Sequence, residues 1–284
     1  TYQWYSSTTG SSWSILPGAT DSSYQPGVLT QTTYYRVDYT SGYDCGTVSS
    51  NVSEVYVHAD IDPGVISSSQ VICYDSLASV IIMTEFPTGG GDISYAYQWQ
   101  YSSDNSSWSD IDGEVTTEYS PGNLTTSSYY RLEVNSTQAD QQGLICGPKY
   151  TESVYIEVYD PLLSGVLSSD QTICYSTIPG ELSFSVPPTG AAGVLDYEYQ
   201  WQVSTDMVLW SDIESSTGTT YSPDVLYETT YYRVRVSSLY DCGIVFTPAL
   251  TVNVYDELLS GTITEIDTIC HGTVPGLIST QTGP

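Results

Sequence analysis

The residues best suited to chemistry are carboxylates gathered in one short segment. Residues 103–114 carry Asp104, Asp110 and Asp112 among Ser and Asn side chains, and Ca²⁺ prefers oxygen ligands of this kind. The segment does not follow the EF-hand pattern, and the equivalent residues 6–18 contain no carboxylate. We therefore expect a hairpin turn, with a calcium site on the three aspartates as the alternative.

No other set of residues predicts catalysis. His58 and His271 stand alone, with no Ser or Cys at a matching position that could complete a catalytic triad. Paired carboxylates could hydrolyse glycosides only if the fold brought them together in a cleft. We therefore expect neither enzymatic activity nor a cofactor.

The six cysteines indicate a disulfide framework. They belong to two alternating classes, of which one follows Ile and the other precedes Gly: Cys73, Cys174 and Cys270 in the first class, and Cys45, Cys146 and Cys242 in the second. Paired cysteines in a repeated pattern are typical of an oxidising, extracellular compartment. No Cys-x-x-Cys motif or nearby His completes a zinc site.

Two pairing schemes are open. In the first, Cys73 pairs with Cys146 and Cys174 with Cys242, while Cys45 and Cys270 take partners outside this chain. Each bond would close a loop of about 70 residues and contribute about 4 kcal/mol in the chain-entropy model. In the second, each Cys-Gly cysteine pairs with the Ile-Cys cysteine 28 residues further on. We expect the first scheme, because the constant 28-residue spacing needs only a linker of fixed length.

The elements that must position these residues occur as a repeat. A Tyr-Gln-Trp motif is followed by a Tyr-Tyr-Arg motif three times, and both landmarks advance by 95 and then by 102 residues. The landmarks are Trp4, Trp99 and Trp201, and Arg36, Arg131 and Arg233. The spacing predicts a partial repeat at 1–60, complete repeats at 61–160 and 161–257, and the start of another at 258–284.

Each repeat is predicted to be an all-β, immunoglobulin-like sandwich. In the second repeat, β-rich runs separated by turn residues fall at 65–66, 71–73, 79–83, 95–100, 129–134 and 154–159. We expect Trp4, Trp99 and Trp201 to lie in the core on the third strand, and the second Trp of each repeat to be partly covered. Tyr129 and Tyr231 resemble the tyrosine corner of such domains, and we expect both in the structural core.

The basic position that recurs in each repeat departs from the pattern of antibody domains. Arg131 stands where those domains have a cysteine, so their usual inter-sheet disulfide cannot form. We expect Arg36, Arg131 and Arg233 to be partly buried, each stacked on an aromatic ring or paired with a carboxylate. A ligand-binding role for these arginines is the alternative.

The charge of the chain restricts its partners. There are 33 acidic and 5 basic residues, which gives a formal net charge of −28. This charge argues against nucleic acid or an anionic membrane surface, and favours solubility and repulsion between neighbouring filaments. No apolar run of about 18 residues predicts a membrane span.

The combined motifs resemble one known family along the whole chain. Gly-x-Ile/Leu, Ile-Cys, Tyr-Gln-Trp-Gln, Trp-Ser-Asp-Ile, Tyr-Ser-Pro, Thr-Thr-Tyr-Tyr-Arg and Cys-Gly are similar to the immunoglobulin-like repeats of giant surface adhesins in Flavobacterium-type Bacteroidota. The resemblance implies type IX secretion, anchoring at the outer membrane, partnership with the gliding machinery, and an extended filament for gliding, adhesion or biofilm formation. It implies no catalytic residue.

Short modification motifs are also present. Ser76 and Thr268 lie in Asp-Ser/Thr-apolar motifs, which resemble the O-glycosylation signal of exported Bacteroidota proteins. Asn-x-Ser/Thr sequons occur at Asn51, Asn105, Asn123 and Asn135.

The leading functional hypothesis is a structural spacer on the cell surface. In it, linked sandwiches project an adhesive end, and regions outside this chain bind surface polysaccharide or another ligand. The alternative is a carbohydrate-binding array that uses exposed Tyr and Trp, either by itself or as an accessory to a secreted polysaccharide hydrolase. Burial of the Trp residues distinguishes the two.

Overall fold

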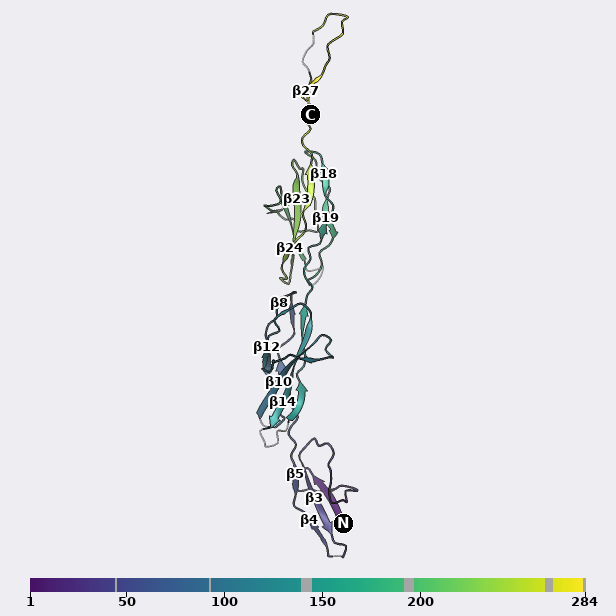
Figure 1. Ribbon diagram of the computed structural model, residues 1–284, viewed down its shortest axis with the longest axis vertical. Coiled ribbons are helices and arrows are strands. Elements are labelled where there is room, and N and C mark those ends of the chain that lie inside the picture. The colour runs from purple at the N-terminus through teal and green to yellow at the C-terminus, as the bar shows by residue number, and fades with distance from the viewer. Residues whose placement is uncertain (44, 92, 139–144, 192–196, 264–267, 283–284) are drawn as a thin grey trace. The chain divides into compact units, whose positions relative to one another are not determined.

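The protein is described from a computed structural model covering residues 1–43, 45–91, 93–138, 145–191, 197–263 and 268–282 (Figure 1). Within these residues every regular element is a β-strand. The chain divides into two compact units, Thr1–Gln70 with Leu77–Glu157, and Val71–Ser76 with Val158–Pro284. No described helix is long and apolar enough to cross a membrane.

The described residues of the second repeat form two main sheets and a separate two-stranded ladder. The larger has the order β11-β10-β14-β16-β7, with β15 also paired to β14, and the long strands β10 and β14 lie side by side (Figure 1). The smaller has the order β12-β9-β6, and β13 pairs with β8. The strands are β6 (Val65–Ile66), β7 (Gln70–Ile72), β8 (Ser76–Leu77), β9 (Ile81–Glu85), β10 (Ile93–Ser102), β11 (Ser109–Asp110), β12 (Glu118–Tyr119), β13 (Asn123–Leu124), β14 (Ser128–Gln138), β15 (Ile145–Tyr150) and β16 (Val154–Val158).

The third repeat has the same topology. Its larger sheet is β18-β25-β23-β20-β21 with β24 on β23, and its smaller sheet is β17-β19-β22. The first strand, β18, pairs in parallel with the last, β25, whereas the other ladders are antiparallel. The strands are β17 (Val166–Leu167), β18 (Gln171–Ile173), β19 (Leu182–Val186), β20 (Tyr197–Ser204), β21 (Ser211–Asp212), β22 (Thr220–Tyr221), β23 (Thr230–Ser238), β24 (Ile244–Phe246) and β25 (Leu250–Val254).

The first repeat contributes a single sheet. Its order is β2-β1-β3-β4, with β5 also paired to β3. After the third repeat, β26 and β27 form a two-stranded ladder. The strands are β1 (Tyr2–Ser7), β2 (Ser14–Ile15), β3 (Thr33–Thr40), β4 (Thr47–Ser49), β5 (Ser53–Val55), β26 (Thr262–Ile263) and β27 (Thr280–Thr282).

Strand alternation builds the core of each complete repeat. On β14, Tyr130, Leu132 and Val134 point inward and are buried, as are their counterparts on β23. Trp99 and Trp201 are 0% exposed and lie at the centres of the two cores, as expected. The two sheets of a repeat therefore pack as the predicted immunoglobulin-like sandwich.

Two expectations about the core are wrong. Tyr129 and Tyr231 are only half-buried, because they lie on the face opposite Tyr130 and Tyr232, which are 4% and 3% exposed. Trp4 is also only half-buried. In the second repeat, Trp99 is covered by the smaller sheet β12-β9-β6. The described residues of the first repeat form one sheet, so no second sheet covers Trp4 there.

The glycine of the Gly-x-Ile/Leu motif has a steric role. Gly64 and Gly165 have φ of +79° and +72°, a region that favours glycine. A Cβ atom at Gly64 would collide with the backbone carbonyl of Glu85, and one at Gly165 with that of Val186. Glycine therefore permits the close crossing that begins each complete repeat.

Candidate functional site

The arginine of each complete repeat lies between two aromatic rings. The guanidinium carbon of Arg131 is 4.2 Å from the ring centre of Trp108 and 3.8 Å from that of Tyr150. Arg233 repeats this arrangement, at 4.3 Å from Trp210 and 4.2 Å from Phe246. The arginines stack as expected, and each covers one face of the second Trp.

Hydrogen bonds fix the orientation of this arginine. Arg131 Nε donates to Gln100 Oε1 at 2.8 Å, and Gln100 Nε2 donates to Asp110 Oδ1 at 2.7 Å. In the third repeat, Arg233, Gln202 and Asp212 form the same chain, with both bonds at 2.7 Å. Burial lowers the pKa of both arginines from their usual value. The arginine, glutamine and aspartate side chains thus bind one another and stabilise the larger sheet of their own repeat.

The first repeat carries a variant of this arrangement. Position 5, which corresponds to Gln100, is Tyr, and the Arg36 guanidinium carbon lies 5.2 Å from the Tyr5 ring and 4.7 Å from the Trp13 ring. Without the glutamine, Arg36 Nε has no hydrogen-bond partner and lies 3.7 Å from Asp38 Oδ1. Because Tyr5 replaces the glutamine of the complete repeats, the first repeat lacks the arginine–glutamine–aspartate hydrogen bonds.

Asp104 organises the hairpin turn. Its Oδ1 accepts hydrogen bonds from the backbone N–H groups of Ser106 and Ser107 at 2.9 and 2.7 Å, and from the Ser102 hydroxyl at 2.9 Å. These bonds, led by that from Ser107, lower the pKa of Asp104 well below its usual range. Asp206 makes the corresponding bonds to the N–H groups of Val208 and Leu209.

The proposed calcium ligands are not brought together. Among the residues that the structure describes, no three His, Cys, Asp or Glu side chains form a cluster able to hold a metal ion. Asp104 accepts bonds from its own turn, Asp110 accepts from Gln100, and Asp112 is exposed. Asp104 and Asp110 therefore accept hydrogen bonds from different groups of the hairpin, which supports the turn interpretation.

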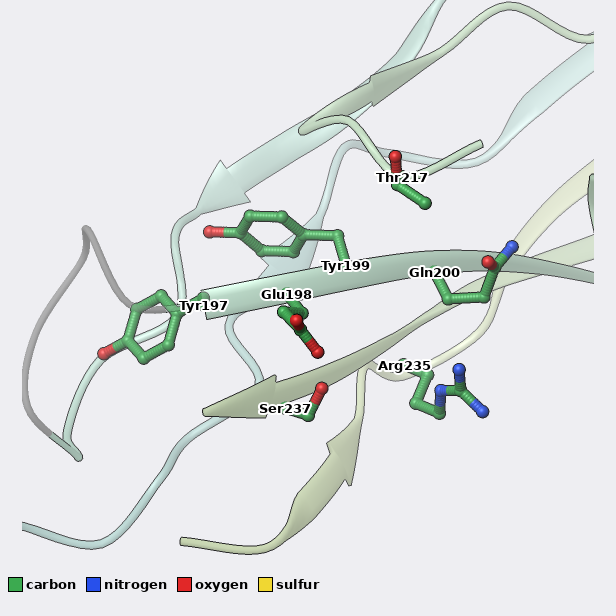
Figure 2. A pocket seen from close by; sticks show the side chains of 7 residues that line it. All are labelled: Tyr197, Glu198, Tyr199, Gln200, Thr217, Arg235 and Ser237. Atoms are coloured by element: carbon green, nitrogen blue, oxygen red, sulfur yellow. The ribbon is translucent and has the colours of Figure 1, made fainter. Parts of the chain in front are cut away.

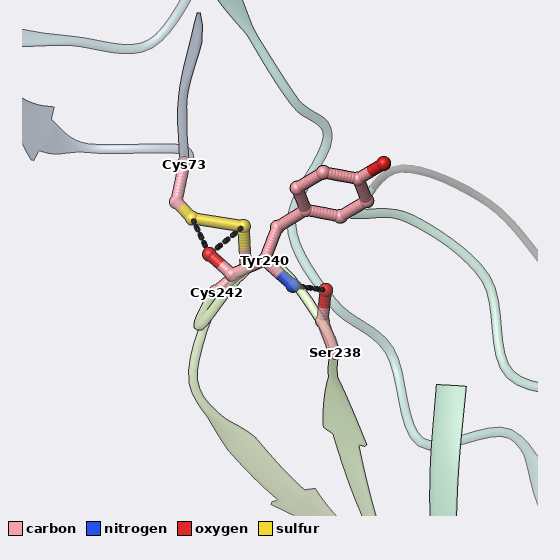
Figure 3. Close-up of a disulfide and its surroundings, with 4 residues drawn as sticks. All are labelled: Cys73, Ser238, Tyr240 and Cys242. Carbon is pink, nitrogen blue, oxygen red and sulfur yellow. Dashed lines mark hydrogen bonds between the residues drawn. A yellow bond between two sulfur atoms is a disulfide. The ribbon is translucent and has the colours of Figure 1, made fainter. Parts of the chain in front are cut away.

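The disulfide prediction is wrong in its pairing. Cys73 is bonded to Cys242, 169 residues away, with 5.3 Å between the Cα atoms (Figure 3). Cys146 and Cys174, the expected partners, are free, as are Cys45 and Cys270. Both bonded sulfurs lie 3.8 Å from the Tyr240 carbonyl oxygen. The bond therefore joins an Ile-Cys cysteine to the Cys-Gly cysteine of the following repeat.

The strand order explains this pairing. The backbone N–H of Tyr159, at the end of the second repeat, donates to the carbonyl of Ile72 at 3.0 Å. Cys73 is thereby held beside the residues that enter the third repeat, and it lines a cavity of about 190 Å³ together with Asp160, Pro161 and Cys242. The first strand of a repeat thus ends beside the start of the next repeat.

A shallow pocket lies on the larger sheet of the third repeat. Figure 2 shows its lining side chains on β20 and β23, with Thr217 from a neighbouring loop. Its volume is about 500 Å³, and the lining residues are Tyr197, Glu198, Tyr199, Gln200, Thr217, Arg235 and Ser237. Gln200 Nε2 already donates to the carbonyls of Trp201 and Ile213. Ala96, Val115 and Glu133 replace Glu198, Thr217 and Arg235 in the second repeat, so this chemistry is not repeated.

The two candidate O-glycosylation sites differ in environment. Ser76 begins β8, is half-buried, and lies three residues beyond the bonded Cys73; its backbone N–H donates to the Cys73 carbonyl. Thr268 is exposed, but Asp267 of its motif lies outside the described residues.

The chain belongs to one sequence family over most of its length. The family described as "Domain of unknown function (DUF8696)" matches residues 1–59, 62–160 and 163–256. The protein is thus a tandem array of DUF8696 domains with an immunoglobulin-like fold. No curated protein matches the chain.

Matches among solved structures include two multidomain chains. The three N-terminal domains of the bacteriophage RB49 Highly Immunogenic Outer Capsid protein (Hoc) are 12% identical, with 90% of this chain and 89% of that chain covered and a TM-score of 0.38. Domains A168–A170 of titin are 13% identical, with 89% and 87% covered and a TM-score of 0.35.

Proposed function

We propose that this array is a structural spacer in a secreted, acidic cell-surface adhesin, which holds an adhesive region away from the cell. The observation that carries the proposal is the contrast between repeated and unrepeated features. The polar and aromatic groups that recur are engaged within their own repeat, as with Trp99 in the core, Arg131 between two rings and Asp104 in its turn. The pocket described on the third repeat is not reproduced in the second, where Ala96, Val115 and Glu133 replace its Glu198, Thr217 and Arg235.

The acidic composition fits this role. A net charge of −28 disfavours lateral association of neighbouring copies and keeps exposed sheets soluble. Type IX secretion, outer-membrane anchoring and a role in gliding belong to this proposal through the sequence resemblance. Arrays of repeated domains, in which each repeat contacts only its neighbours, gain length as repeats are added.

The second candidate function is carbohydrate binding by the third repeat. The pocket combines the rings of Tyr197 and Tyr199 with Glu198 and Arg235, groups able to stack on and hydrogen-bond a sugar. The Arg235 side chain is 40% exposed, and its salt bridge to Asp212 is long, at 3.9 Å. Its guanidinium can therefore still bind a ligand.

A glycan array probed with the 284-residue chain distinguishes the two functions. The spacer proposal predicts no reproducible binding above that of a Glu198→Ala, Arg235→Ala variant. A saturable signal that this variant loses would support the carbohydrate-binding function and contradict a pure spacer. The variant changes only exposed or half-exposed side chains, so its fold should be retained.

A further inference from the structure

Each cysteine of the Cys73–Cys242 bond has an equivalent with a free thiol in the other complete repeat: Cys174 corresponds to Cys73, and Cys146 to Cys242. At the exit of the second repeat, the Tyr159 N–H donates to the Ile72 carbonyl at 3.0 Å. At the exit of the third repeat, the Tyr255 N–H donates to the Ile173 carbonyl, also at 3.0 Å. Cys174 therefore lies beside the residues that leave its repeat, as Cys73 does, and its thiol is exposed.

The Cys-Gly hairpins are equivalent too. Cys242 lies between β23 and β24, and its sulfur is 3.8 Å from the carbonyl of Tyr240, two residues earlier. In the first repeat, the Cys45 thiol donates to the carbonyl of Tyr43, again two residues earlier, at 3.6 Å. Cys146 lies within β15, which pairs with β14 as β24 pairs with β23, and it precedes Tyr150 by the same spacing by which Cys242 precedes Phe246.

The entry to each complete repeat is built alike. The Gly90 N–H donates to the Ala59 carbonyl at 2.7 Å, and the Ala191 N–H donates to the Asp160 carbonyl at 2.8 Å. Next to the first of these contacts, Lys149 of the Cys146 strand pairs with Asp60 at 2.7 Å. Cys146 therefore belongs to an entry region that matches the one occupied by Cys242.

We propose that these disulfides form a periodic series, in which the Ile-Cys cysteine of each repeat is bonded to the Cys-Gly cysteine of the next. Under this rule only Cys73 and Cys242 have both partners in this chain, and theirs is the bond that is formed. Cys174 takes the Cys-Gly cysteine of a following repeat, and Cys146 takes the Ile-Cys cysteine of a preceding one. The inference does not depend on the adhesin proposal.

The chemistry is a two-electron oxidation of two thiols. A Cys174 thiolate attacks the disulfide of an oxidised thiol–disulfide oxidoreductase, and one sulfur of that enzyme leaves as a thiolate. The second protein thiolate then attacks the Cys174 sulfur of the mixed disulfide. The bond between repeats forms, both electrons remain on the reduced oxidoreductase, and the two thiol protons go to solvent.

The series changes how the array carries tension. A load applied to the two ends of the chain passes from Cys73 directly to Cys242, so the 169-residue separation between them is bypassed. Residues within the bypassed segment, including β10 and β14, are then protected from extension. When the protein is stretched and unfolded, the oxidised chain should be shorter than the reduced chain by about 600 Å, at roughly 3.5 Å per residue.

Disulfide mapping of an extended chain tests the pairing rule. In this chain residues 161–257 are inserted a second time after residue 257, and the protein is oxidised and digested without reduction for mass spectrometry. We expect the Cys73–Cys242 bond plus a bond from Cys174 to the Cys242 of the inserted copy. Cys242→Ser in that copy alone should return Cys174 to a free thiol. A bond from the original Cys174 to Cys146 or to the original Cys242, or a free thiol at the original Cys174, would overturn the rule. The Cys174 of the inserted copy should stay free, because residues 258–284 contain no Cys-Gly cysteine.

Single-molecule stretching of the 284-residue chain tests the load path. We expect the fully unfolded contour length to increase by about 600 Å when reductant is added. A Cys73→Ser variant should have the longer contour with or without reductant. A wild-type contour that does not change on reduction would contradict the bypass.

Discussion

The indole N–H of Trp99 donates a hydrogen bond of 2.9 Å to the backbone carbonyl of Thr116, 17 residues later. The same bond joins Trp4 to Asp21 at 3.0 Å and Trp201 to Gly218 at 2.9 Å, again across 17 residues. The indole thus fills the core and also satisfies a carbonyl of the chain that follows its hairpin.

Trp99→Ala should therefore destabilise the second repeat strongly. The substitution leaves a cavity and an unpaired carbonyl, and losses of about 3–5 kcal/mol are typical for a buried aromatic residue. Trp4→Ala is the matched control and should cost less, because Trp4 is half-buried. Calorimetric unfolding of each variant measures the difference. Equal losses of unfolding free energy in the two variants would contradict the conclusion that Trp99 contributes more to the core than Trp4.

Asp104→Ala should lower the melting temperature of the second repeat. The change removes acceptors for the Ser106 and Ser107 N–H groups, whereas Asp104→Asn keeps one oxygen and should retain part of the effect. The folded pKa of Asp104 is lowered, so its contribution is complete above its unfolded pKa near 4 and declines as the pH falls below that value.

Thermal scans of the wild type and both variants between pH 7 and pH 2 check this sign. The difference between wild type and Asp104→Ala should shrink toward acid. A difference that grows as the pH falls would exclude the carboxylate as the stabilising group. Addition of millimolar Ca²⁺ at pH 7 should leave the wild-type melting temperature unchanged if the aspartate serves only the turn.

Much of the core could be predicted from the sequence, because repetition reinforces a weak strand pattern. Trp99 and Trp201 recur at one position of an alternating strand, so burial of that face follows. The tyrosine prediction failed, since Tyr129 and Tyr130 are adjacent and a shift of one residue reverses the buried face. The inward positions of Leu132 and Val134 are the signal that identifies Tyr130 as the core residue.

The disulfide could not be predicted from spacing. The choice between Cys146 and Cys242 for Cys73 depends on where a strand of only three residues, β7, pairs in the sheet. Because β7 pairs with β16, Cys73 lies at the end of the repeat. The spacing of the cysteines in the sequence does not indicate this pairing. The ring on the far side of Arg131, Tyr150, was missed for a related reason: β15 follows a loop of different length in each repeat.

Alkaline pH should destabilise the second repeat through Tyr130. Burial, assisted by the nearby Tyr119 hydroxyl and opposed by a hydrogen bond from Ser128, raises the pKa of Tyr130 to about 12. The unfolded chain loses this proton first as the pH rises, so the contribution is complete below about pH 10 and is lost between about pH 10 and pH 12. Tyr130→Phe should flatten the decline in melting temperature over this window. Tyr101→Phe, at an exposed position, serves as the control and should leave the decline as it is in the wild type.

Arg131→Lys should destabilise the second repeat by about 1–2 kcal/mol, although the charge is kept. A lysine cannot stack a planar group between Trp108 and Tyr150 while it donates to Gln100. Arg235→Lys is the matched control and should change stability by less than about 0.5 kcal/mol, because its partner Asp212 is 3.9 Å away and solvent-exposed. A double-mutant cycle of Arg131→Lys with Trp108→Ala, followed by denaturant unfolding, should give a coupling energy of about 0.5–2 kcal/mol. A coupling energy of zero would mean that the guanidinium and the indole contribute to stability independently, and the stacking account of this position would have to be abandoned.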